Sequence, residues 1–183
     1  FLWMCQGYYR HTEGYTPEWT DMAKFKGLIV HPQKWPEDLD YKNKRVIVIG
    51  SGATAATLIP AMANDCAHVT MLQRSPTYFR TGLNAIEIAE QLRQLQVDEK
   101  WIHEITRRKI LFDQDAFTRK TFEEPEAAKK DLLSAVEAYL GKDYDIATHF
   151  TPRYRPWRQR IAFIPDGDLF QGIKSGKASV VTD

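Results

Sequence analysis

The sequence has 183 residues, 43% of them hydrophobic, and its 25 Lys and Arg nearly balance its 24 Asp and Glu. This balance leaves no overall positive field of the kind that draws a protein to nucleic acid or to an anionic membrane, so we expect small-molecule partners. The isolated Cys5 and Cys66 exclude a disulfide framework and a cysteine-rich metal site, and no apolar stretch reaches the roughly 18 residues of a transmembrane helix, which favours a cytoplasmic protein without metal.

The first half of the chain contains one strand-helix-strand unit. The apolar residues 1–5 predict a buried strand, and because the chain starts inside this run we expect it to be part of a longer protein. Arg45–Ile49 is a β-branched run and predicts a central parallel strand covered on both faces. Ala53–Ala63 predicts a helix that Pro60 bends or shortens. Val69–Leu72 predicts the second strand of a right-handed βαβ unit.

The second half begins with helical periodicity. Apolar residues at three- and four-residue spacings predict amphipathic helices over Leu83–Leu95, Trp101–Leu111 and Ala127–Leu140, and we place a helical insertion at 83–141. From Tyr144 the chain becomes aromatic, basic and rich in proline. It ends in strand-like segments over Arg160–Ile164 and Ala178–Val181.

A glycine turn directly follows the strand Arg45–Ile49. Gly50, Ser51, Gly52, Ala53, Thr54 and Ala55 match the pattern G-x-G-x-x-A between a strand and a helix. The first glycine permits the tight turn, the second lets a pyrophosphate approach the backbone, and Ala55 lets the helix pack close to the strand. The helix N-terminus adds unpaired N–H groups and a partial positive charge. The turn predicts a dinucleotide site in a Rossmann-like, doubly wound α/β domain; the alternative is a glycine turn of another α/β protein.

The residues after the second strand indicate which dinucleotide is bound. An NAD site places a carboxylate here to bind the ribose hydroxyls, but this chain has Arg74 and Ser75. The Arg74 guanidinium can pair with a 2′-phosphate, and Ser75 can donate beside it. We therefore expect NADPH. The alternative is that Arg74 is a solvated surface residue.

A motif upstream of the turn carries a family resemblance. Phe25, Gly27, His31, Trp35 and Pro36 resemble the F-x-G-x-x-x-H-x-x-x-W-[P/D] fingerprint of type I Baeyer-Villiger monooxygenases, which are class B flavoproteins. The Trp separates them from flavin monooxygenases that oxidise nitrogen and sulfur, which usually carry Tyr or Phe there. The late segments 149–152 and 156–160 are similar to the ethionamide-activating group of the same family.

The resemblance implies a fragment of a flavoprotein with two dinucleotide domains, which uses FAD and NADPH. The implied order is the end of the FAD domain, a linker with the motif, the NADP-binding βαβ unit, the helical insertion and the rest of the NADP domain, over 1–24, 25–40, 41–82, 83–141 and 142–183. On this reading His31 and Trp35 couple domain movement to the chemistry and are neither acid nor base. Without the resemblance, a lone His is more often a hydrogen-bonded structural residue.

The resemblance also assigns a catalytic residue. Family members carry an arginine beside the flavin, and Arg160 matches it. A guanidinium can stabilise a flavin peroxide and a tetrahedral adduct without giving up its proton. Gln159 stands where the family often has a Lys that contacts the 2′-phosphate, so Arg74 is expected to carry more of that contact. Read alone, the arginines of 153–160 could also form a nucleic-acid patch.

The activity that the resemblance implies is insertion of one oxygen atom from O2 into a ketone, or oxidation of sulfur. Three alternatives remain: a nitrogen- or sulfur-oxidising flavin monooxygenase, a flavin disulfide reductase, and an inactive NADP-binding module. The lack of a C-x-x-C pair argues against the reductase. The chain has only one glycine fingerprint, so the FAD adenosine turn is expected outside it.

Overall fold

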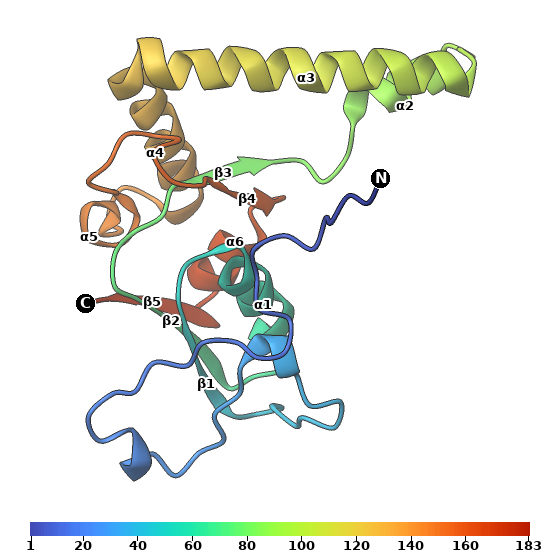
Figure 1. Cartoon of the computed structure of the whole chain (residues 1–183). Coiled ribbons are helices and arrows are strands. Elements are labelled where there is room, and N and C mark those ends of the chain that lie inside the picture. Colours follow the sequence, from blue (N-terminus) through green and yellow to red (C-terminus); the bar gives the residue numbers. More distant parts are fainter. The chain divides into compact units, whose positions relative to one another are not determined.

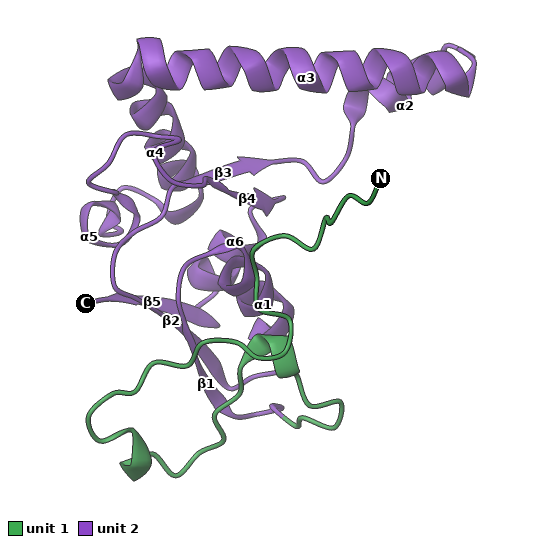
Figure 2. Ribbon diagram, viewed as in Figure 1, with its two compact units in different colours: residues 1–40 green, residues 41–183 purple.

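The computed structural model describes residues 1–183 and divides into two compact units, residues 1–40 and residues 41–183 (Figures 1 and 2). The first unit contains two single-turn 3-10 helices, η1 (Met22–Lys24) and η2 (Pro32–Lys34), and no strand. The strand expected over residues 1–5 is therefore wrong. Phe1 to Met4 are exposed, and a strand forms only when its backbone N–H and C=O groups find a partner.

The second unit is built on a three-stranded parallel sheet. Its strands are β1 (Arg45–Ile49), β2 (His68–Gln73) and β5 (Ala178–Thr182), in the order β1-β2-β5. Helix α1 (Ala53–Ala63) connects β1 to β2, which confirms the α/β fold class. In this register Ile49 lies beside Leu72 and Leu72 beside Val181, so the carboxyl ends of all three strands lie together and form the carboxyl edge of the sheet.

Strand β1 is an edge strand of this sheet. Val46 and Val48 are half-buried, but Ile47 and Ile49 are 59% and 58% exposed. Helix α1 and helix α6 (Asp168–Lys174) pack together against the face of the sheet that bears Val46 and Val48 (Figure 1). The expectation of a central strand covered on both faces is therefore wrong, because an apolar run does not show how many neighbours a strand has.

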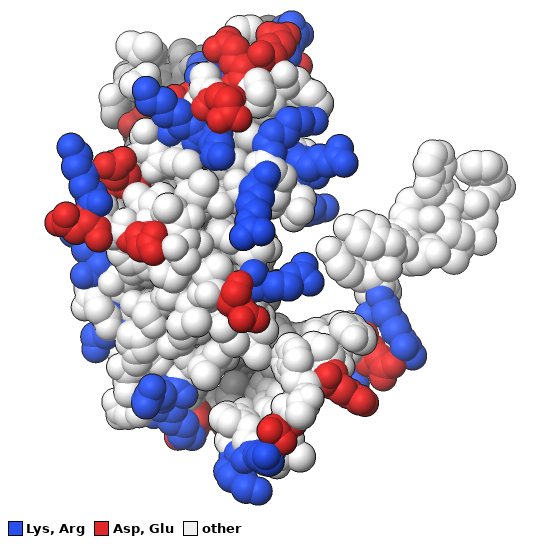
Figure 3. Space-filling model, turned by 90° about the vertical axis from the view of Figure 1, so that its left-hand side faces the viewer, with Lys and Arg blue, Asp and Glu red and all other residues white.

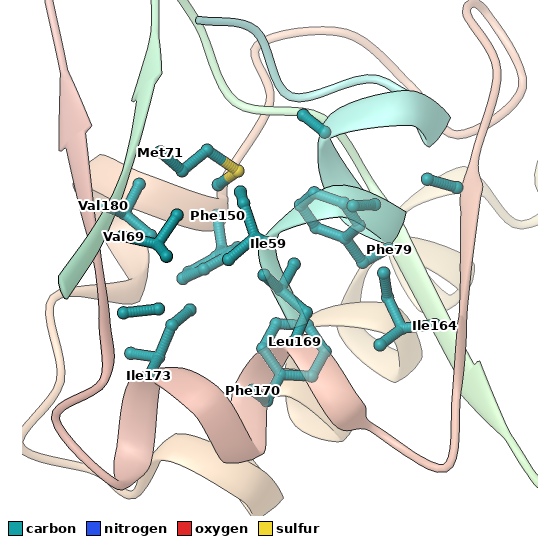
Figure 4. Close-up of a cluster of buried hydrophobic side chains, with 14 of the residues drawn as sticks. Ile59, Val69, Met71, Phe79, Phe150, Ile164, Leu169, Phe170, Ile173 and Val180 are labelled. Carbon is teal, nitrogen blue, oxygen red and sulfur yellow. The ribbon is translucent and has the colours of Figure 1, made fainter. Parts of the chain in front are cut away.

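The main core lies between the sheet and these two helices. Figure 4 shows buried hydrophobic side chains converging there, among them Ile59 of α1, Val69 and Met71 of β2, Val180 of β5 and Phe170 of α6. Helix α1 has the predicted bounds, Ala53–Ala63, and continues through Pro60, so this proline does not shorten it. The buried Ala55 and Ala56 bring the start of α1 close to the sheet. Packing of this helix therefore fixes where its N-terminus lies.

The remaining elements lie around a second, two-stranded parallel sheet, β3 (Phe79–Gly82) with β4 (Ala162–Pro165). Four helices separate these strands in the sequence: α2 (Glu87–Gln94), α3 (Glu99–Glu123), α4 (Pro125–Leu140) and α5 (Ile146–Phe150). The first three were predicted, although α3 extends well beyond the predicted end at Leu111. Asp98 caps α3 by accepting from the Lys100 N–H, and Gly141 ends α4 with a φ of 88°. None of the helices has the length and apolar character needed to cross a membrane.

Candidate functional site

The glycine turn lies where the sequence predicts it, between β1 and α1. Gly50 has a φ of +119°, which residues with a side chain rarely adopt. Its N–H donates to the Leu72 carbonyl at 2.8 Å. Gly52 is the N-cap of α1 in an extended conformation that any residue can adopt. A Cβ added at Gly50 or Gly52 would meet no atom within 4 Å. The backbone conformation thus requires the first glycine, whereas the second leaves the approach to the turn open.

The N-terminus of α1 can accept an anion. No side chain caps this helix, and the Ala56 N–H is the first to bond within it, to the Gly52 carbonyl at 3.0 Å. The preceding N–H groups of the first turn are those that a helix leaves unpaired, and they carry the positive end of its dipole. Ala53 and Thr54 are exposed at this end. These features fit the pyrophosphate of a dinucleotide.

Arg74 and Ser75 follow β2 at the same edge of the sheet. Both are exposed, and the Ser75 carbonyl accepts from the Ser51 hydroxyl at 3.5 Å. The Arg74 side chain forms no ion pair or hydrogen bond within the chain, so its guanidinium is available to a ligand. The segment from Leu72 to Tyr78 contains no carboxylate that would repel a phosphate. The glycine turn and Arg74 therefore lie on adjacent segments at this edge of the sheet.

A group of hydroxyl-bearing residues, which the sequence analysis missed, connects this edge to the aromatic and basic segment 151–160. The Ser51 and Thr77 hydroxyl oxygens lie 3.0 Å apart. The Tyr78 hydroxyl donates to the Tyr154 carbonyl at 2.8 Å, and the two rings pack edge to face with centroids 5.5 Å apart. In the sequence, only the position of Thr77 just after the second strand could have indicated this group of hydroxyl-bearing residues.

Burial changes the acidity of both tyrosines. It raises the pKa of Tyr78 to about 12, and the negative charges that Tyr154 and Glu126 carry when ionised act in the same direction. Burial also raises the pKa of Tyr154, although hydrogen bonds with Thr77 and with the Tyr78 backbone work against it. Both phenols therefore stay neutral at physiological pH and hold the segment in place as hydrogen-bonding groups.

The arginines of 151–160 have different surroundings. Arg155 lies over the Phe122 ring at 4.1 Å and donates to the Pro156 carbonyl, so it attaches the segment to α3. Arg160 is exposed, as is the neighbouring Gln159, and it precedes β4, whose Ala162 N–H donates to the Tyr78 carbonyl at 3.0 Å. Arg160 forms no hydrogen bond with the glycine turn. Figure 3 shows several Lys and Arg side chains close together on one face of the molecule.

The motif residues of the first unit contact their own surroundings. The His31 Nδ1 accepts from the Gln33 N–H at 3.2 Å and caps η2. Its ring leaves no space for a side chain at Gly14, where a Cβ would lie 2.0 Å from the imidazole. A Cβ at Gly27 would lie 2.5 Å from the Phe25 ring. Trp35 is 38% exposed. These contacts give the motif glycine and histidine a local packing role.

Gln33 connects this motif to the preceding loop. Its side-chain amide donates to the carbonyls of Arg10 and His11 at 2.9 and 3.0 Å. The loop from Gly7 to Pro17 is thus held against the motif.

In the other unit, an open groove of about 410 Å³ lies between α2 and α3, and none of the expected site residues lines it.

Known proteins match this chain over its whole length. The chain is 46% identical over 184 aligned positions to the FAD-containing monooxygenase EthA of Mycobacterium tuberculosis H37Rv, and 44% identical to EthA of Mycolicibacterium smegmatis. Both alignments cover 100% of this chain, which spans 37% of the length of each relative. No protein-family model matches the sequence.

Solved structures show the same fold. The match to a steroid monooxygenase bound to NADP covers 92% of this chain and 39% of the chain of that enzyme, with a TM-score of 0.62 at 22% identity. A cyclohexanone monooxygenase from Rhodococcus sp. Phi1 bound to NADP+ matches 92% of this chain, and 38% of its own, with a TM-score of 0.61 at 19% identity. The homology to EthA covers every part of the sequence. The chain is therefore homologous, over its whole length, to part of the FAD-containing monooxygenases.

Proposed function

We propose that this chain is the NADPH-binding part of an FAD-dependent monooxygenase that inserts one oxygen atom from O2 into a ketone or oxidises sulfur. One observation carries the proposal: the open glycine turn at an uncapped helix N-terminus lies beside Arg74, an unpaired cation. The relatives are FAD-containing monooxygenases, and two structures of the same fold carry NADP. NADPH supplies a hydride when it is bound.

The residues of the glycine turn bind and orient the cofactor in this proposal. The N–H groups of Ala53 and Thr54 receive the pyrophosphate, and Gly52 allows the close approach. Ser51 reaches Thr77 and Ser75, so the turn and the ribose segment form one surface. Ala55 is buried against the sheet and keeps the helix N-terminus in position.

Arg74 gives the preference for NADPH over NADH. Its exposed guanidinium can form two parallel hydrogen bonds with a 2′-phosphate, with the Ser75 hydroxyl beside it. Because Gln159 stands near the chain position where the family often has Lys, we assign most of this contact to Arg74. NADH has no phosphate at this position, so it gains nothing from the guanidinium.

Arg160 is the proposed catalytic cation. Its guanidinium keeps its proton at physiological pH and can stabilise negative charge on the reacting atoms. Arg160 is exposed within this chain, and no contact holds its side chain away from a ligand. His31 and Trp35 are proposed to couple domain movement to the chemistry. The division of the chain after Asp40 supports a linker over 25–40, before the NADP-binding unit at 41–82.

Two measurements on the complete protein test the proposal. Ester formation from a cyclic ketone, with one NADPH oxidised per product, supports ketone oxidation. Product from amines without any ester would instead assign the complete protein to the nitrogen- and sulfur-oxidising enzymes, and product from sulfides is expected in either case. The second measurement is the dissociation constant of each nicotinamide cofactor for Arg74→Ala. We expect a ten- to hundredfold loss for NADPH, on the order of one charge-assisted contact, and little change for NADH.

Arg45→Ala is the matched control for Arg74→Ala. Arg45 is also exposed, but it begins β1 and therefore lies at the opposite edge of the sheet. We expect it to leave both affinities unchanged. Equal weakening of NADPH and NADH by Arg74→Ala would mean that Arg74 is structural, and the cofactor assignment would lose its support.

A further inference from the structure

Gln73 is a buried polar residue at the carboxyl end of β2. Its side chain is 2% exposed, and it directly precedes Arg74. Its side-chain amide nitrogen donates to the His149 carbonyl at 2.7 Å and to the Thr182 hydroxyl at 2.9 Å. Gln73 and Thr182 are also partners in the parallel register of β2 and β5. The amide thus joins three segments at the edge of the sheet where the cofactor turn lies.

The other half of this amide has no partner. Gln73 Oε1 is buried without a hydrogen bond. The reverse orientation of the amide would turn Oε1 towards the His149 carbonyl, which can only accept, so this carbonyl fixes the orientation that leaves Oε1 unpaired. A buried unpaired acceptor lowers stability, whereas an apolar side chain of the same size would avoid that loss but would leave the His149 carbonyl without this donor. The glutamine therefore joins the three segments, and its unpaired oxygen offsets part of the stability that its two hydrogen bonds contribute.

The segments joined by Gln73 lead to the two proposed cations. On one side the backbone continues from Gln73 into Arg74 and Ser75. On the other side the His149 carbonyl belongs to the last turn of α5, which leads into the segment 151–160 and Arg160. His149 Nδ1 lies 2.8 Å from the Thr182 hydroxyl, which closes the network. The backbone here is also held by the Asp183 N–H, which donates to the Gln73 carbonyl at 3.0 Å, so the amide adds the link from the end of β2 to α5.

We propose that Gln73 is a positioning residue for the 2′-phosphate: its amide fixes the end of β2 against Thr182 and His149, and so sets the direction of Arg74. This inference rests on the proposed function, in which Arg74 binds NADPH. Gln73 itself does not touch the cofactor in this proposal. It acts only on the part of the cofactor that distinguishes NADPH from NADH.

The test compares cofactor preference with stability in the complete protein. Gln73→Met keeps the length of the side chain and removes the amide. We expect the dissociation constant of NADPH to rise on the order of tenfold and that of NADH to change less than about twofold, because only the charge-assisted contact loses its geometry. The melting temperature should fall by a few degrees, because two hydrogen bonds are lost and removal of the unpaired oxygen offsets only part of that loss.

Two further variants serve as controls. Thr70→Val removes a hydrogen bond between the same two strands, that with Ser179 at 3.3 Å, away from the carboxyl edge, and we expect no change in preference. Thr182→Val removes the second acceptor of the Gln73 amide, and we expect a smaller shift in the same direction. Thr182→Ser keeps the hydroxyl and should restore the preference. This pair tests the network if Gln73→Met fails to fold.

The outcomes separate this inference from the function on which it rests. If Gln73→Met weakens NADPH and NADH equally, or if both Gln73→Met and Thr182→Val leave the preference intact, Gln73 does not position Arg74. The proposed function stands in that case, provided that Arg74→Ala still narrows the preference. If Arg74→Ala has no selective effect either, the NADPH assignment fails, and this inference fails with it.

Discussion

The hydroxyl oxygen of Thr77 lies 3.0 Å from that of Ser51, so the segment after β2 contacts the middle of the glycine turn. Ser51 also reaches the Ser75 carbonyl. These hydrogen bonds therefore link the turn that would hold the pyrophosphate to the segment that would hold the ribose.

The Ser51–Thr77 contact can be measured by a double-mutant cycle. Ser51→Ala and Thr77→Val each remove one hydroxyl, and we expect a coupling free energy of about 0.5 to 1.5 kcal/mol, that of one hydrogen bond. We expect NADPH affinity to fall a few-fold in either single variant. Chemical denaturation and cofactor titration of the four proteins provide the two readouts. Strictly additive free energies of unfolding would show that the contact contributes nothing.

The two glycines of the turn should respond differently to alanine. Gly52→Ala meets no atom and needs no unusual φ, so we expect the free energy of unfolding to change by less than about 1 kcal/mol. Cofactor binding should fall by at least about tenfold, because the new methyl group occupies the approach to the helix N-terminus. Gly50→Ala must adopt a φ of +119° and should cost about 1 to 3 kcal/mol of stability. Normal NADPH binding by a folded Gly52→Ala protein would contradict the proposed site.

Tyr78 should make stability fall at high pH. Burial raises its pKa from 10.0 to about 12, so its contribution is complete below about pH 10 and is lost as the pH rises towards 12. In this window the unfolded chain releases the phenolic proton and the folded chain keeps it, which lowers the free energy of unfolding by up to about 1.4 kcal/mol per pH unit.

Tyr78→Phe isolates this effect. The variant should lose about 1 kcal/mol at neutral pH, because its ring no longer donates to the Tyr154 carbonyl, and its stability should depend less on pH above 10. Denaturant unfolding between pH 9 and 11 provides the measurement. Tyr15→Phe is the control, since Tyr15 is 85% exposed and its loss should leave the slope unchanged. An identical slope in Tyr78→Phe would show that Tyr78 does not titrate as described.

Arg160→Ala in the complete protein should separate cofactor oxidation from product formation. We expect NADPH oxidation to continue while ester formation falls by about 100-fold or more, as when a preorganised charge is removed from a reacting centre. Hydrogen peroxide release should rise correspondingly, and peroxide and product assays on one sample measure both. Arg158→Ala removes a neighbouring exposed arginine and should retain product formation. Unchanged ester formation in Arg160→Ala would remove this residue from the catalytic assignment.

The features that the sequence alone determined are local ones. The run Arg45–Ile49, the turn at Gly50 and the helix Ala53–Ala63 all lie where the pattern predicts them. A β-branched run, a residue that accepts positive φ and a run of helix-forming residues each act on their own stretch of chain. The turn residues and Arg74 could therefore be identified as a candidate site before any tertiary contact was known.

Tertiary structure decided everything that depends on a distant partner. Residues 1–5 have the composition of a strand but no neighbouring strand, and β1 lies at an edge of its sheet although its sequence is typical of a central strand. The pairing of β3 with β4 spans the whole helical insertion, so no local pattern could predict it. The bonds from Gln73 to His149 and Thr182 likewise join residues far apart in the sequence. A sequence pattern records the preference of a segment, but burial and hydrogen bonding depend on which other segments fold against it.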